Sequence, residues 1–101
     1  MKPYANRRNE RDVIPFEVVA EVSDKTVVVR EMICDRAPDW RPVIVMLQCI
    51  NNDDQEWLIT SDPKGLSFKI RLQKNGKWKD AQGNYYTLDD EPQRWHRFGV
   101  L

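Results

Sequence analysis

The sequence is poor in the residues that most catalytic and cofactor sites require. Its 101 residues include one histidine, two cysteines and four glycines, and each glycine stands alone in the chain. A structural zinc site needs four closely spaced cysteine or histidine ligands, and a phosphate-binding loop needs clustered glycines. Neither pattern occurs, so we expect no metal, no cofactor and no enzymatic activity.

The two cysteines, Cys34 and Cys49, leave alternatives open. They can form one disulfide or remain thiols, and in a reducing compartment isolated cysteines more often pack as small apolar residues. Either one can also be paired with His96 as a nucleophile and base, because such partners meet in space and not in sequence. Any chain with these residue types offers that pairing, so we favour two unbonded thiols.

Charge of one sign and long apolar runs are also lacking. Sixteen basic residues balance sixteen acidic ones, which removes the overall positive field of a general nucleic-acid or membrane-surface binder. The longest apolar run, residues 43–47, is too short to cross a bilayer, and no apolar stretch of a secretory signal follows the first basic residues. We therefore expect a cytoplasmic protein that does not bind membranes.

The chain has room for one domain. Residues 1–12 carry four basic and two acidic side chains without an apolar period, which predicts a mobile basic arm. Residues 13–101 then form a single domain, and their nine aromatic side chains are enough for a small core.

The first half of this domain contains several short runs typical of strands. Residues 16–22 alternate apolar and polar side chains and residues 25–32 are rich in β-branched residues, which predicts a hairpin. Residues 34–42 contain two prolines and predict a loop around a buried Trp40. Residues 43–50 are apolar on both faces and indicate a strand covered on both sides, although periodicity alone also fits a short buried helix.

The second half contains the clearest local pattern. Residues 55–60 predict a strand, and residues 66–79 predict a tight hairpin because alternating residues lead into Asn-Gly, the pair favoured in a type I′ turn. Residues 85–88 and 94–100 predict two further strands, the last at a sheet edge. Together these patterns predict an all-β fold of six to seven short antiparallel strands, as a small SH3-like barrel or a compact β-sandwich.

Basic residues gather in segment 64–79, which has no acidic residue, while segments 51–62 and 80–91 contain acidic residues and no basic ones. One interpretation is charge pairing between neighbouring strands. The other is a basic hairpin that follows a phosphate backbone while Trp78 stacks on a base. We favour charge pairing, because the acidic neighbours would cancel most of the attraction for phosphate.

A second candidate surface lies near the C-terminus, at Arg94, Trp95 and Arg97. Aromatic and arginine side chains are enriched at binding hot spots, although a strand that closes a barrel would have the same composition. The candidate binding residues from both surfaces are Lys69, Arg71, Lys74, Lys77, Trp78, Lys79, Arg94, Trp95 and Arg97.

Residues 14–19, 27–32 and 70–78, followed by an aromatic-rich tail, resemble small accessory proteins carried by bacteriophages and integrated mobile elements. Members of that family typically end in a tail rich in tyrosine and phenylalanine, whereas this chain has Trp95 and His96 there. The resemblance implies a non-enzymatic factor that acts inside a bacterium on a host protein or nucleic acid, and it provides no catalytic residue.

These observations lead to two functional hypotheses. In the first, the domain binds a host protein, for example to inhibit a defence or regulatory factor. In the second, the basic hairpin 64–79 binds nucleic acid, aided by the arginines of the N-terminal arm. The oligomeric state stays open, because an uncovered strand edge can pair with its copy.

Overall fold

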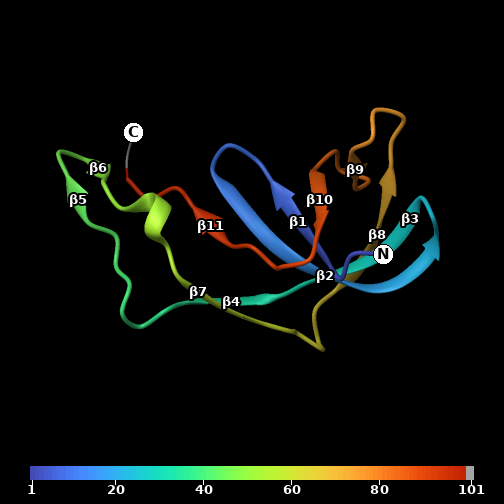
Figure 1. Ribbon diagram of the computed structural model, residues 1–101, viewed down its shortest axis with the longest axis horizontal. Helices are drawn as coiled ribbons and strands as arrows, with labels where there is room; N and C mark the ends of the chain where they lie inside the picture. The colour runs from blue at the N-terminus through green and yellow to red at the C-terminus, as the bar shows by residue number, and fades with distance from the viewer. Residues whose placement is uncertain (100–101) are drawn as a thin grey trace.

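The computed structural model describes residues 1–99, and its regular secondary structure consists of β-strands joined by turns and loops (Figure 1). One short 3₁₀ turn, η1 (Asn52–Asp54), interrupts them. The strands are β1 (Tyr4–Arg8), β2 (Asp12–Ser23), β3 (Thr26–Glu31), β4 (Ile33–Arg36), β5 (Ile44–Val45), β6 (Gln48–Cys49), β7 (Trp57–Thr60), β8 (Ser67–Leu72), β9 (Trp78–Lys79), β10 (Tyr85–Asp89) and β11 (Trp95–His96).

Six of these strands close into an antiparallel barrel. Their order is β1-β10-β9-β8-β3-β2, and a pairing between β1 and β2 completes the ring. The twelve-residue β2 pairs with two other strands of the ring, with β1 along its first half and with β3 along its second half. Strand β11 adds a seventh strand at the start of β2. The predicted all-β fold is confirmed, with a small SH3-like barrel as its form.

The core fills the inside of this ring. Alternation along the strands turns one set of side chains inward, and the buried cluster consists of Ala5, Phe16, Val27, Val29, Ile70 and Tyr86. The Phe16 ring meets the rings of Phe68 and Tyr86 edge to face, with centroids 5.5 and 5.4 Å apart. Each large apolar side chain buried in this way stabilises the fold by roughly 1.5–3 kcal/mol.

Residues 4–8 correct the expectation of a mobile arm over residues 1–12. They form β1, which lies between β2 and β10, and both Ala5 and Asn6 are fully buried. The Asn6 amide donates to the Asp89 carboxylate at 2.8 Å, and its oxygen accepts from the Gln93 backbone N–H at 2.8 Å. The prediction failed because the two buried residues of β1 are an alanine and a hydrogen-bonded asparagine. The segment therefore shows no alternation of large apolar side chains and has the composition of a solvated arm.

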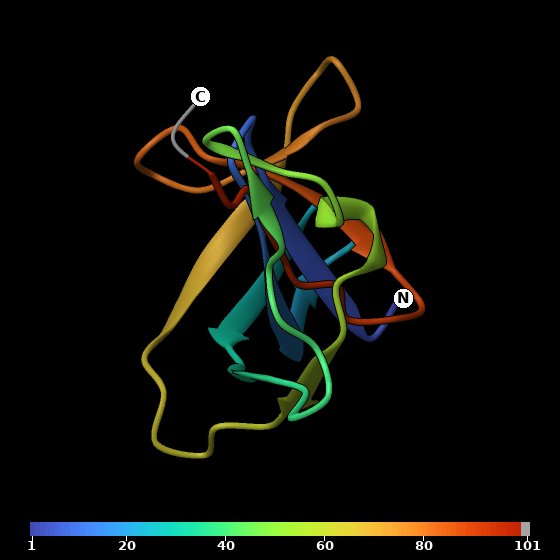
Figure 2. The same cartoon turned by 90° about the vertical axis from the view of Figure 1, so that its left-hand side faces the viewer.

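Residues 43–50 correct the expectation of a strand covered on both sides. They form the separate hairpin β5–β6, which lies at the opposite end of the molecule from the β2–β3 turn (Figure 1). Figure 2, turned so that this end faces the viewer, shows the hairpin in green in front of the barrel strands. The β4–β7 ribbon connects it to the barrel, so residues 34–36, expected in a loop, belong to strand β4.

The other local predictions fare better. The hairpins β2–β3 and β8–β9 and the strands β7 and β10 are confirmed, Trp40 is buried, and both cysteines are unbonded thiols. Of the strand expected over residues 94–100, only Trp95–His96 form β11, and residue 100 lies outside the described residues. The β8–β9 turn differs in type, because Gly76 has a positive φ of 82° and Asn75 does not. Gly76 N–H donates to the Gln73 carbonyl at 3.0 Å, and Gln73 N–H donates to the Lys77 carbonyl at 2.8 Å. This is a three-residue loop with a bulge, not a two-residue type I′ turn.

Candidate anion-binding site

A hollow of about 760 Å³ opens beside β8 and β9, and four cationic side chains line it. Lys69 and Arg71 come from β8, Lys79 from β9 and Arg7 from β1. The other lining residues are Phe68, Gln73, Asp80, Ala81 and Gln82. Four cations against one carboxylate give this hollow a positive potential within a chain of zero net charge.

Strand geometry explains why these cations meet. Ile70 points into the core, so the alternation of β8 places Lys69 and Arg71 on the opposite face. The antiparallel register sets Arg71 directly opposite Lys79. Like charges at directly opposed positions destabilise a sheet, so the free protein bears a repulsion at this place that a bound anion would relieve.

The charge pairing expected for segment 64–79 is wrong for the described part of the chain. Ion pairs join Lys2 to Asp90, Arg8 to Asp89, Arg30 to Glu17, and both Arg94 and His96 to Asp12. No ion pair within residues 1–99 involves a basic residue of segment 64–79. The reason is topological, because β8 lies between β3 and β9, and neither strand brings a carboxylate opposite its cations.

Asp80 lies at the rim of the hollow and holds the turn after β9. Its Oδ1 accepts the backbone N–H groups of Gln82 and Asn84, and its Oδ2 accepts the side chains of Asn84 and Tyr86. Burial alone would raise the pKa of Asp80, but the hydrogen bonds outweigh that effect and lower it. This carboxylate is therefore committed to shaping the turn that borders the hollow.

The remaining residues predicted on the basic hairpin divide into two groups. Lys74 and Lys77 are exposed near the turn, and Lys77 Nζ and Lys79 Nζ lie 5.1 and 5.6 Å from the Tyr85 ring centroid. Trp78 instead packs against the buried core cluster. Phe68 packs against the same cluster but also lines the hollow, so the aromatic side chains near the cations are Phe68 and Tyr85, whereas the sequence had suggested Trp78.

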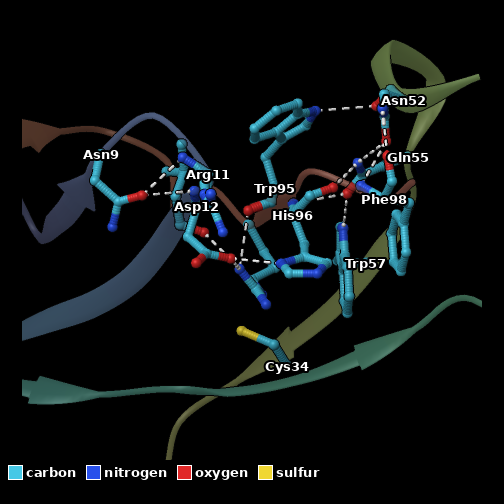
Figure 3. Close-up of polar contacts among 12 residues, drawn as sticks. Asn9, Arg11, Asp12, Cys34, Asn52, Gln55, Trp57, Trp95, His96 and Phe98 are labelled. Atoms are coloured by element: carbon cyan, nitrogen blue, oxygen red, sulfur yellow. Dashed lines mark hydrogen bonds and ion pairs between the residues drawn. The ribbon is translucent and has the colours of Figure 1, made fainter. Parts of the chain in front are cut away.

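The second predicted surface is largely engaged inside the molecule (Figure 3). The Arg94 guanidinium donates to the Asp12 carboxylate at 3.2 Å and lies 4.9 Å from the Trp57 ring centroid. The Trp95 indole N–H donates to the Asn52 carbonyl at 3.0 Å. These contacts attach β11 to the barrel and to the segment around η1. Of the three predicted residues, Arg97 alone is exposed.

The same cluster brings His96 and Asp12 together, with Nδ1 2.7 Å from Oδ1 (Figure 3). Burial alone would raise the pKa of Asp12, but hydrogen bonds from His96 and Arg94 lower it. Cys34 lies near this group on β4, and burial raises the pKa of its thiol. Because the thiolate is the nucleophilic form, this shift disfavours the reactive state of Cys34.

Two further features bear on the type of site. Within residues 1–99 the side chains of His, Cys, Asp and Glu form no group of three or more that is suited to a metal ion. The described part of the chain also contains no helix long and apolar enough to span a membrane.

Comparison of the chain with protein-family models, curated proteins and solved structures finds no match. The resemblance to phage and mobile-element proteins thus rests on the sequence segments alone.

Sequence reasoning did not place Arg7 or Phe68 at this hollow. Arg7 was expected on a mobile arm that assists the basic hairpin, and Phe68 was seen only as part of the alternating pattern of residues 66–79. Pairing of β1 with β10 brings Arg7 to the hollow from the other end of the chain. No local pattern signals such a pairing, because it joins segments about eighty residues apart.

Proposed function

We propose that this protein is a non-enzymatic binding module that holds the phosphate backbone of single-stranded nucleic acid at its cationic hollow. The observation that carries the proposal is the direct opposition of Arg71 and Lys79 without a neutralising carboxylate. Arg7 and Lys69 complete a set of four cations around one space. Each phosphate bound there would release counterions and relieve the repulsion between the side chains.

The shape and lining of the hollow favour an unpaired strand over a duplex. Its volume of about 760 Å³ is in the usual range of ligand pockets, roughly 300–1,000 Å³. An unpaired nucleotide can enter such a space, whereas a duplex would meet only its rim. The exposed ring of Tyr85 beside Lys77 and Lys79 offers an aromatic face on which a base can stack, and Phe68, which also packs against the core, adds apolar lining.

Binding of an acidic host-protein segment is the second candidate, and the same cations support it. Arg94 and Trp95, the other surface proposed for a protein partner, have their polar groups engaged within the chain. A host protein would therefore bind at the hollow too. The two candidates differ in whether capture of a partner survives nuclease treatment.

The test measures fluorescence anisotropy of labelled oligo(dT) and oligo(rU) over a range of salt concentrations. The variant Lys69→Gln/Arg71→Gln/Lys79→Gln removes three cations of the hollow and is expected to weaken binding at least tenfold. Its salt slope should fall by about 2, since each phosphate contact on a single strand contributes about 0.7. The matched control, Lys2→Gln/Arg41→Gln/Lys64→Gln, removes three exposed cations elsewhere and should bind like the unaltered protein.

Two results would contradict the nucleic-acid proposal. One is the absence of salt-dependent binding by the unaltered protein, and the other is equal loss of affinity in the hollow variant and the control. A pull-down from bacterial lysate with and without nuclease addresses the second candidate. A protein that is retained after nuclease treatment and lost with the hollow variant would assign the hollow to an acidic protein segment.

A further inference from the structure

The β5–β6 hairpin presents an apolar surface to solvent, independently of the cationic hollow. Six of its eight residues are large apolar side chains that are at least 47% exposed, and Met46 at the tip reaches 89%. They are Val43, Ile44, Val45, Met46, Leu47 and Ile50. Large apolar side chains that are exposed together in one segment are typical of interaction sites.

The hairpin also has an open strand edge. The Val43 carbonyl accepts from the Ile50 N–H at 2.9 Å, and the Val43 N–H donates to the Asn51 side chain at 2.8 Å, so both groups point toward β6. Alternation then turns the N–H and C=O of Ile44 to the other side. Among the described residues β5 pairs only with β6, so these two groups of Ile44 face outward without a strand partner.

The lack of charged residues in the hairpin indicates which partner can pair with the open edge of β5. Residues 42–52 contain no charged side chain. In a two-fold symmetric contact the same patch meets itself, so an uncharged patch can pair with its own copy without like-charge repulsion. An anionic membrane fits less well, because the exposed Asp53 and Asp54 follow the hairpin directly and the hairpin has no tryptophan or tyrosine.

We propose that two copies of this chain associate through the edges of their β5 strands. The strands pair antiparallel about a two-fold axis at Ile44, and each Ile44 N–H donates to the carbonyl of the partner's Ile44. The two hairpins then form one four-stranded sheet in the order β6-β5-β5-β6. This arrangement lays the Met46-Leu47 tip of each hairpin beside the base of the other and brings the apolar side chains of the two β5 strands into cross-strand contact.

The association is tested by sedimentation velocity from micromolar concentrations to on the order of 1 mM, because a contact this small is expected to be weak. The unaltered protein should shift from monomer to dimer. Ile44→Lys and Ile44→Glu each place like charges opposite one another and should raise the dissociation constant at least tenfold. An equimolar mixture of the two variants should associate again. Leu66→Lys, which changes an 87% exposed residue outside the hairpin, should dimerise normally.

Several outcomes would overturn this proposal. They are a monomer at every concentration, undiminished association of Ile44→Lys, and a mixture of the two Ile44 variants that stays monomeric although both are folded by circular dichroism. Binding of the unaltered monomer to anionic vesicles, lost in Ile44→Glu, would assign the hairpin to a membrane instead. None of these measurements involves the hollow, so the dimer and the nucleic-acid proposal can fail separately.

Discussion

The Tyr86 hydroxyl donates a 2.8 Å hydrogen bond to Oδ2 of Asp80, and this bond ties the barrel core to the turn that borders the cationic hollow. Tyr86 is 3% exposed. Burial raises the pKa of Tyr86, and the neighbouring Asp80 carboxylate raises it further. The hydroxyl therefore stays protonated and remains a donor across the whole range of physiological pH.

Replacement of Tyr86 by phenylalanine should destabilise the protein by about 1–2 kcal/mol, because the Asp80 carboxylate loses one charge-assisted donor and keeps its others. Urea denaturation at pH 7 measures the change. Tyr85→Phe is the matched control, since Tyr85 is exposed and keeps its ring, and it should lie within about 0.5 kcal/mol of the unaltered protein. Equal stability of the two variants would show that the Tyr86 bond contributes nothing.

Stability should fall in acid because the hydrogen bonds of Asp80 hold its folded-state pKa below the unfolded value of about 3.9. The contribution of such a group is present above the unfolded pKa and is lost as the pH falls through the lower folded one. The free energy of unfolding should therefore decline below about pH 5. Asp80→Asn should be less stable at pH 7 and decline less steeply. The charge-matched control is Asp24→Asn, and identical acid profiles of the two variants would contradict the prediction.

Removal of residues 1–8 should prevent folding, because it opens the ring and leaves β2 and β10 without their shared neighbour. It also takes away the buried Asn6, which receives and donates hydrogen bonds near the C-terminal segment. Far-UV circular dichroism and amide NMR spectra test this. Removal of residues 1–2 alone is the control, since it breaks only the exposed Lys2–Asp90 ion pair, worth at most about 1 kcal/mol. A folded 9–101 fragment would restore the interpretation of this segment as a dispensable arm.

The β5–β6 hairpin should become more stable when the two residues at its tip are replaced by residues that favour a positive φ. Met46 and Leu47 have φ values of 51° and 66°, a left-handed conformation that costs non-glycine residues of order 1 kcal/mol each. Met46→Asn/Leu47→Gly should relieve this strain and slow amide hydrogen exchange at Ile50, whose N–H closes the hairpin. The exchange at Ile70 in the barrel core serves as the internal reference. Unchanged or faster exchange at Ile50 would contradict the prediction.

Local sequence patterns predicted part of the candidate site correctly and failed for the rest. The basic composition of segment 64–79 and its hairpin follow from neighbouring residues, and they correctly placed Lys69, Arg71 and Lys79 together. Charge pairing was expected from the order of segments along the chain. It failed because the strand order in the barrel sets β3, not an acidic segment, beside β8.

By itself the sequence determined the all-β class, the two main hairpins and the buried position of Trp40. These depend on side-chain alternation, β-branched residues and turn-forming pairs, which act over a few neighbouring positions. Only the tertiary structure decided that residues 4–8 close the barrel, that residues 43–50 stand in solvent, and that Arg7 reaches the hollow. Each of these depends on which distant strands pair. That choice is a cooperative property of the whole ring and is not encoded in any one segment.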